Sequence, residues 1–436
     1  MPSGRAGQGG RARYKGEGVL KPRRFVICFD GTWNAPSKTA KPTNVVNMVR
    51  AVRTRGNDGW SQIVFYDKGV GSAGGADALL GGLFGYGLTE NMIDGYRFLA
   101  NNFEPGDEIY VFGFSRGAYT ARALAGFVAL VGLLMPANLG VDLAKVMSIF
   151  RDKEIDRDEK LRRIDALELK PRRETNIRCV GVWDTVGSLG IPSDIGLTFQ
   201  HGKYYFHDVE LGKKIDVALH AVAVDEKRSA FSPTIWVSED GEPLSDRQTV
   251  EQVWFAGAHS NIGGSYNDST LSDIAFDWMV KRVSKFTDLA LDNPFPDDWS
   301  PDIAEAKSID SRGKLYFTSR ALPYQRIIGR CIPEEQGFGD WFRRNIPALD
   351  RRNIPPNDLK TVNERLHVSV LERWNRKEVL HDCKDDKDKR KVPYRPVNLK
   401  AVIEGHHAGT CDIPVVGWDG EILNPVDAAK VWPAAG

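Results

Sequence analysis

Short apolar runs recur along the N-terminal part of the chain, and each is bounded by polar or glycine-containing segments. They cover residues 24–30, 62–69, 108–115, 177–184 and 250–259. Apolar residues are continuous in these runs rather than alternating with polar ones, which is typical of strands covered on both faces of a parallel sheet. We therefore predict that these runs are strands of one central sheet.

Segments with helical periodicity separate several of these runs. They span residues 43–52, 88–103, 116–134 and 271–283. Repeated alternation of strand and helix is the signature of a doubly wound domain. The predicted fold class is α/β, with a mostly parallel central sheet and helices on both faces.

The pattern weakens at both ends of the chain. Residues 1–22 are rich in glycine and arginine, so we expect a disordered tail, with an RNA-binding tail as the alternative. The α/β core is predicted over 23–285, with a charged helical insertion at about 135–175. Residues 286–436 are Pro-rich and irregular, which predicts a C-terminal cap or subdomain packed on the core.

Charge and composition narrow the choice of partner. The net charge of the 436 residues is +1, which favours neither nucleic acid nor an anionic membrane as a partner. The five cysteines are scattered without CxxC spacing, which argues against a disulfide framework or a zinc site and favours a reducing compartment. The sequence shows no signal-peptide pattern and no apolar run of membrane-spanning length, so we expect a cytoplasmic protein; secretion by a specialised system is the alternative.

A serine between two glycines follows the third apolar run. Gly113, Ser115 and Gly117 form a Gly-x-Ser-x-Gly motif between a predicted strand and a predicted helix. This context is that of a nucleophile elbow in an α/β-hydrolase, a tight turn that raises the serine hydroxyl above the sheet. Ser115 is therefore the candidate nucleophile.

A serine nucleophile needs a base and an orienting carboxylate, which in this fold follow it in the order acid, then histidine. His259 ends the run 250–259 and precedes a glycine-containing loop, unlike the other seven histidines. Asp184 likewise ends a predicted strand and is the preferred carboxylate. Asp225 also ends an apolar run and is the rival, although the charged residues that follow it suggest an ion-pair site.

The oxyanion of an acyl-transfer reaction needs backbone amides as donors. We expect the Arg116 amide to supply one donor, and the loop after the first strand, at Gly31 and Thr32, to supply others. Asp30 before this loop suggests an alternative, a Mg²⁺-dependent phosphohydrolase with an aspartyl nucleophile. That chemistry usually has an acidic residue at the position of Thr32.

Five blocks in order resemble a bacterial α/β-hydrolase family that includes the phospholipase effectors of type VI secretion. They are FDGTWN at 29–34, GFSRGAYTAR at 113–122, VGVWDTVGSLG at 180–190, HAVAVDEKRSAFSP at 220–233 and WFAGAHSNIGGSY at 254–266. The resemblance implies the same nucleophile, acid and base: Ser115, Asp184 and His259. One departure is Asn261, where the family usually carries an aspartate.

These features predict a serine esterase or lipase-type hydrolase that needs no metal or cofactor. The expected substrate is a small-molecule or lipid ester, including phospholipid acyl esters, with transient membrane contact and no nucleic acid. The Gly-rich segment 71–87 is expected either to line an acyl pocket or to form a packed turn. A non-catalytic binding module on the same fold and a secreted antibacterial toxin are the alternatives.

Overall fold

A computed structural model of the chain describes most of its residues. The described ranges are 21–31, 41–69, 83–152, 154–169, 172–173, 175–186, 213–228, 231–238, 240–243, 245–312, 324–332, 359–385 and 387–434. The predicted tail up to residue 20, Thr32 and residues 71–82 of the Gly-rich segment lie outside these ranges.

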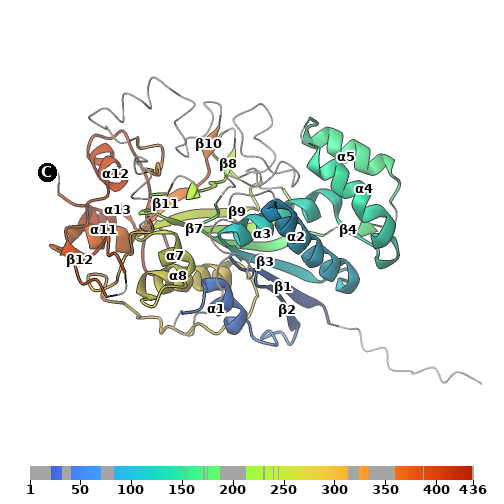
Figure 1. Cartoon of the computed structure of the whole chain (residues 1–436), viewed down its shortest axis with the longest axis horizontal. Helices are drawn as coiled ribbons and strands as arrows, with labels where there is room; N and C mark the ends of the chain where they lie inside the picture. The colour runs from blue at the N-terminus through green and yellow to red at the C-terminus, as the bar shows by residue number, and fades with distance from the viewer. Residues whose placement is uncertain are drawn as a thin grey trace, which may run out of the picture.

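An eight-stranded sheet forms the centre of the molecule (Figure 1), in the order β14-β11-β9-β7-β6-β3-β1-β2. Every pairing between neighbours in it is parallel. The fold is therefore α/β-hydrolase-like. The strands are β1 (Arg23–Phe29), β2 (Ser61–Asp67), β3 (Glu108–Phe114), β6 (Ile177–Trp183), β7 (Ile215–Ala223), β9 (Thr249–Phe255), β11 (Glu364–His367) and β14 (Val415–Val416).

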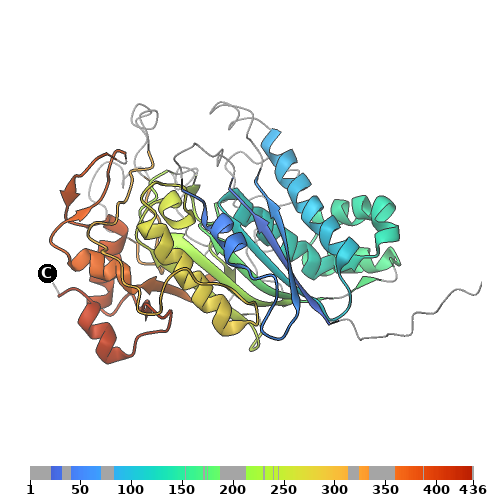
Figure 2. The ribbon, with the colours of Figure 1, turned by 90° about the horizontal axis from the view of Figure 1, so that it is seen from below.

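Helices cover both faces of the sheet (Figure 2). Side chains such as Ile27 and Val111 belong to the apolar core on one face, which includes α2 (Leu83–Asn102) and α3 (Arg116–Val131). The neighbouring Cys28 and Phe112 belong to the core on the other face, with α1 (Asn44–Ala51) and α8 (Thr270–Phe286). Burial on both faces explains why the strands read as continuous apolar runs.

The five predicted strands are confirmed as β1, β2, β3, β6 and β9, and the four predicted helices as α1, α2, α3 and α8. The central strand β7 was not among the predicted strands, although it lies in the apolar run that ends at Asp225. The two-residue strand β14 and the four-residue strand β11 are too short to give a periodic signal.

Two helices lie in the region of the predicted insertion. They are α4 (Leu139–Arg151) and α5 (Arg157–Ala166), and their buried residues join the core beside α2 and α3. The Asp156 side chain caps α5 by accepting a hydrogen bond from the Glu159 amide. No described helix is long and apolar enough to cross a lipid bilayer.

The C-terminal region continues the central sheet, because β11 pairs with β9 and β14 pairs with β11. A third apolar cluster packs residues of this region, including Leu366, Leu371 and Val402, against Trp254 of β9. The predicted boundary at residue 285 stays a prediction.

The remaining elements are short. The helices are η2 (Pro136–Asn138), α7 (His259–Gly263), α11 (Val368–Asn375), α12 (Val397–His407) and α13 (Pro425–Val431). The paired strands are β4 (Leu133–Leu134) with β5 (Arg172–Arg173), β8 (Val237–Ser238) with β10 (Lys360–Thr361), and β12 (Val379–Leu380) with β13 (Lys391–Val392).

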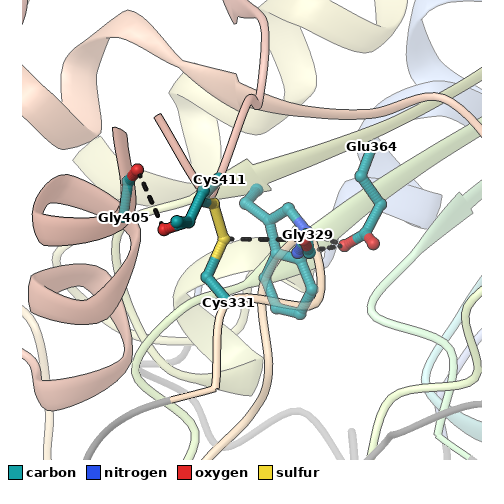
Figure 3. Close-up of a disulfide and its surroundings, with 7 residues drawn as sticks. Gly329, Cys331, Glu364, Gly405 and Cys411 are labelled. Atoms are coloured by element: carbon teal, nitrogen blue, oxygen red, sulfur yellow. Dashed lines mark hydrogen bonds between the residues drawn. A yellow bond between two sulfur atoms is a disulfide. The ribbon is translucent and has the colours of Figure 1, made fainter. Parts of the chain in front are cut away.

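A disulfide joins Cys331 to Cys411 across 80 residues, with a Cα–Cα separation of 5.9 Å (Figure 3). It connects the segment 324–332 to the residues just after α12. The expectation that the cysteines would form no disulfide is therefore wrong for this pair. Spacing along the sequence could not reveal it, because the pairing depends on how the C-terminal region folds back on itself.

The disulfide should stabilise the folded chain. We expect the double variant Cys331→Ala/Cys411→Ala to lower the free energy of unfolding by about 2 to 4 kcal/mol, because the unfolded chain is no longer constrained by a closed loop. Urea unfolding of both proteins measures this difference. Reductant should destabilise the wild type and leave the variant unchanged. Titration of all five cysteines as free thiols in unreduced, denatured wild type would contradict the bond.

Candidate active site

Ser115 occupies the turn between the end of β3 and the start of α3. Its backbone has φ 60° and ψ −123°, a conformation that is strained for a residue with a side chain. Strain of this kind persists only where the surroundings enforce it. Ser115 thus lies in a strained turn from a strand to a helix.

The two glycines around Ser115 are required by close backbone approach. A Cβ at Gly113 would collide with the carbonyl oxygen of Gly117 and lie 2.7 Å from the Cα of Ala118. A Cβ at Gly117 would collide with the carbonyl oxygen of Phe29. The turn can therefore tighten against β1 only when both positions lack a side chain.

The structure brings Ser115, His259 and Asp184 together at the C-terminal ends of β3, β9 and β6. The His259 Nε2 lies 2.8 Å from the Ser115 Oγ, and the His259 Nδ1 lies 2.5 Å from the Asp184 Oδ2. Because a carboxylate accepts the Nδ1–H, Nε2 is left as the acceptor for the serine hydroxyl. The three side chains thus form one continuous hydrogen-bonded series.

Asp184 is completely buried and lies within a set of donors. Its Oδ1 accepts hydrogen bonds from the Ala223 amide at 2.9 Å and from a guanidinium nitrogen of Arg326 at 2.6 Å. Burial alone raises the pKa of the Asp184 carboxyl, but the charge of Arg326 and the hydrogen bond with His259 outweigh burial and hold that pKa below its ordinary value. Asp184 is therefore ionised at neutral pH.

His259 begins α7 and is held on several sides. Its backbone amide donates to the Glu226 Oε2 at 3.2 Å, and its ring packs against Phe114 and Phe231 with centroid separations of 4.7 and 4.8 Å. Burial lowers the pKa of His259 more than the hydrogen bond with Asp184 raises it. The imidazole is therefore neutral at neutral pH and able to accept a proton.

Of the predicted oxyanion donors, the structure describes Arg116 and Gly31. Arg116 is the first residue of α3, so its amide lies in the first turn, at the positive end of the helix dipole. Burial lowers the pKa of its guanidinium to about 10, which leaves the side chain charged at neutral pH. The Gly31 amide instead donates to the Asp30 Oδ1 at 2.7 Å, so its oxyanion role stays a prediction that this geometry does not favour. Thr32 lies outside the described residues.

The Asp30 carboxylate is hydrogen-bonded to side chains at the start of α1 and in β2. Its Oδ2 accepts hydrogen bonds from the Thr43 hydroxyl at 2.7 Å and the Tyr66 hydroxyl at 2.9 Å. A carboxylate engaged in this way is poorly placed to attack a phosphate, so the geometry favours Ser115 as the nucleophile. Within the described ranges, no group of three or more His, Cys, Asp or Glu side chains is placed to hold a metal ion.

Asp225, the rival carboxylate, lies away from the His259 ring. It accepts from the Gly257 amide at 2.7 Å and from the Tyr394 hydroxyl at 3.0 Å, so it fixes the turn before His259. The charged residues after it do form ion pairs: Glu226 with Arg228, and Lys227 with Asp382.

The other described histidines have structural contacts. The His220 Nε2 accepts from the Thr185 amide, beside Asp184, and burial lowers the pKa of His220 to about 3. His367 is stacked on Phe255, His406 on Trp432, and His407 contacts the Pro433 carbonyl oxygen. His381 packs edge-on against Tyr394, while His201 and His207 lie outside the described ranges.

Asn261, the departure from the family pattern, is buried beneath the His259 turn. Its Oδ1 accepts from the Ala258 amide at 3.2 Å, and its Nδ2 donates to the Lys307 carbonyl at 3.0 Å. A carboxylate could replace the acceptor but not the donor. The asparagine therefore bonds the turn to the segment around residue 307.

Sequence reasoning did not identify Arg326 or the contact between Glu226 and the His259 amide. Glu226 carried a weak signal, because it lies in the charged run after β7. Arg326 carried none: it lies in an irregular region, and Asp184 is 142 residues away along the chain.

A parallel α/β sheet with a Ser–His–Asp arrangement at its carboxyl edge defines an α/β-hydrolase-like protein. The chain belongs to the family of Tle1-like phospholipase effectors of the type VI secretion system: residues 23–282, more than half of the chain, match the catalytic domain of that family.

Individual relatives are distant. An uncharacterized protein of Saccharomyces cerevisiae is 30% identical over 232 residues, which are 48% of this chain and 32% of that protein. An uncharacterized protein from Pseudomonas aeruginosa has 17% identity and a TM-score of 0.41 over 63% of this chain and 47% of its own. The Tle1 effector bound to the VgrG spike has 18% identity and a TM-score of 0.32, over 57% of this chain and 52% of its own. The chain thus spans about a third to a half of these proteins.

Gly263 provides space for Phe114, because a Cβ at this position would lie inside the Phe114 ring. We expect Gly263→Ala to displace Phe114 and the His259 ring that packs against it. It should lower the free energy of unfolding by about 1 to 3 kcal/mol, as overpacking does. Urea unfolding measures the loss.

Gly126→Ala in α3 is the matched control, because a Cβ there meets nothing within 4 Å. It should stabilise the protein by up to about 1 kcal/mol through helix propensity. Equal stability of the Gly263→Ala variant and wild type would contradict the packing argument.

Proposed function

We propose that the chain is a serine hydrolase that cleaves carboxylic esters through an acyl-enzyme intermediate. The observation that carries the proposal is the continuous hydrogen-bonded series from the Ser115 hydroxyl through His259 to ionised Asp184. Ser115 is the nucleophile, His259 the general base and acid, and Asp184 the carboxylate that orients the imidazole.

His259 carries the proton both in the formation of the acyl-enzyme and in its hydrolysis. Ser115 Oγ attacks the ester carbonyl while its proton moves to the His259 Nε2, and the carbonyl oxygen becomes an oxyanion. The intermediate collapses when the C–O bond breaks, and the leaving alkoxide takes the proton from Nε2. Water then attacks the acyl-enzyme in the same way and releases the acid.

The first turn of α3 is the best-placed source of oxyanion stabilisation. The Arg116 amide follows the nucleophile directly, and the helix dipole adds positive potential at this end. The loop after β1 is the expected source of a second donor, although the Gly31 amide donates to Asp30 and Thr32 lies outside the described residues.

Membership of a phospholipase effector family makes phospholipid acyl esters the first substrate class to test. The relatives are much longer than the matched part of this chain, so attachment to a secretion spike and toxicity are separate proposals. Ester hydrolysis is the activity that the described side chains support by themselves.

A fluorophosphonate probe should label Ser115, because only an activated serine is phosphonylated. Ser115→Ala should abolish labelling and reduce hydrolysis of p-nitrophenyl esters and phospholipid vesicles by at least about 10³-fold. Mass spectrometry of the labelled peptide and a panel of short-chain, long-chain and phospholipid esters measure both.

Ser284→Ala is the control, because Ser284 lies exposed on α8. It should retain labelling and activity. Labelling of another residue, or hydrolysis that survives Ser115→Ala, would rule out the mechanism. If folded wild-type protein shows neither labelling nor hydrolysis, the non-catalytic binding module is favoured.

The acidic limb of the kcat/KM profile should have its midpoint below pH 6.5. His259 accepts a proton only as neutral imidazole, so activity is present above its pKa and is lost as pH falls through it. Burial lowers that pKa from the ordinary 6.5, which moves the limb toward lower pH. Steady-state kinetics from pH 4 to 9 test this, with circular dichroism at each pH to exclude unfolding. A midpoint above 6.5 would contradict the assignment.

A further inference from the structure

Arg326 contacts the buried carboxylate that orients His259. Its two terminal nitrogens donate to the two oxygens of Asp184 at 2.6 and 3.0 Å, a bidentate pair in which both side chains are fully buried. The same nitrogens donate to the carbonyl oxygens of Ala223 and Phe231 at 2.8 and 2.6 Å. The guanidinium thus joins Asp184 to the end of β7 and to the residue whose ring packs on His259.

We propose that Arg326 is a positioning residue for the hydrolytic site, which neutralises the buried charge of Asp184 and fixes the carboxylate plane in line with His259. This inference rests on the proposed function. It assigns a role in the site to a residue outside the matched catalytic domain, which ends at residue 282.

The segment that carries Arg326 is anchored on three sides. The Tyr324 amide donates to the Lys227 carbonyl at 2.9 Å, and the Gly329 amide donates to the Glu364 carboxylate at 3.2 Å. Cys331 is bonded to Cys411 (Figure 3). Such anchoring is what a residue needs if its function is to hold another side chain in a fixed orientation.

Charge, as well as shape, requires a cation at this position. An ionised carboxylate without solvent is strongly disfavoured unless an opposite charge compensates it. Without Arg326, either Asp184 becomes protonated at a higher pH, or its uncompensated charge raises the pKa of His259. Both changes remove neutral, correctly oriented His259 at acidic pH, so both move the acidic limb of kcat/KM to higher pH.

The primary experiment is the pH profile of Arg326→Gln with a p-nitrophenyl ester. We expect kcat/KM at pH 7 to fall by about 10- to 100-fold, and the midpoint of the acidic limb to rise by about 1 to 3 pH units. Arg326→Lys retains the charge but not the bidentate geometry, so its midpoint should stay near that of wild type while kcat/KM is reduced. An equal loss at every pH, with an unmoved midpoint in Arg326→Gln, overturns the proposal.

A comparison made in the Asp184→Asn background covers the case in which Arg326→Gln does not fold. Asp184→Asn/Arg326→Gln removes both charges together, which buried pairs tolerate better than loss of one partner. If Arg326 acts through Asp184, adding Arg326→Gln to Asp184→Asn should change kcat/KM by less than about threefold. A larger further loss overturns the proposal.

Chemical rescue provides a third readout. A cavity of about 340 Å³ is lined in part by Arg326, Tyr324 and His381. We expect Arg326→Ala to extend this cavity to the position that the guanidinium occupies. Millimolar guanidinium should restore part of the activity of Arg326→Ala and return its acidic limb toward the wild-type midpoint. Methylammonium at the same concentration is the control for charge without bidentate geometry, and no rescue by either cation counts against the proposal.

The pKa of His259 can be measured without any substrate, by NMR titration of the ring resonance that disappears in His259→Gln. In Arg326→Gln, either this pKa should rise or the hydrogen-bonded Nδ1–H signal should be lost as Asp184 protonates. If wild type cleaves no ester, the proposed function fails, yet this titration still decides the role of Arg326. An unchanged pKa with an intact Nδ1–H signal overturns it.

Discussion

Asp184 is fully buried, and the interactions that keep its carboxylate ionised are the constraint on which the site depends. A buried carboxylate without partners is disfavoured by several kcal/mol. Here its oxygens accept hydrogen bonds from His259, the Ala223 amide and Arg326. These donors come from the ends of two further strands and from the C-terminal region, so the carboxylate can stay charged only when all of these parts are folded together.

The parallel sheet makes this convergence possible. Carboxyl ends of parallel strands share one edge, and β3, β6, β7 and β9 are consecutive neighbours. The ladder continues into the site, since the Ser115 amide donates to the Trp183 carbonyl and the Asp184 amide to that of Ala221. Ser115 and His259 are 144 positions apart along the chain, and Asp184 and His259 are 75 positions apart. Both pairs thereby come within hydrogen-bond distance.

The parts of the site that the sequence predicts are those with a local signature. Ser115, Asp184 and His259 each end an apolar run, and tight backbone approach forces glycine on both sides of Ser115. Arg326 and the Cys331–Cys411 bond have no such signature, because their partners are distant in sequence and are selected by burial in the folded chain. The Gly31 amide could not be assigned from sequence for another reason. A loop can be located from its sequence, but the acceptor to which each of its amides donates cannot.

These contacts also bear on the extent of the folding unit. The family match ends at residue 282, yet β11 pairs with β9, the strand that leads into His259. A chain ending at 282 would expose β9 as an apolar sheet edge and would leave Asp184 without the guanidinium of Arg326. Both defects affect the site, because β9 leads toward His259 and Arg326 contacts Asp184. The sheet and the buried charge therefore require the chain to continue at least through β11 at Glu364–His367.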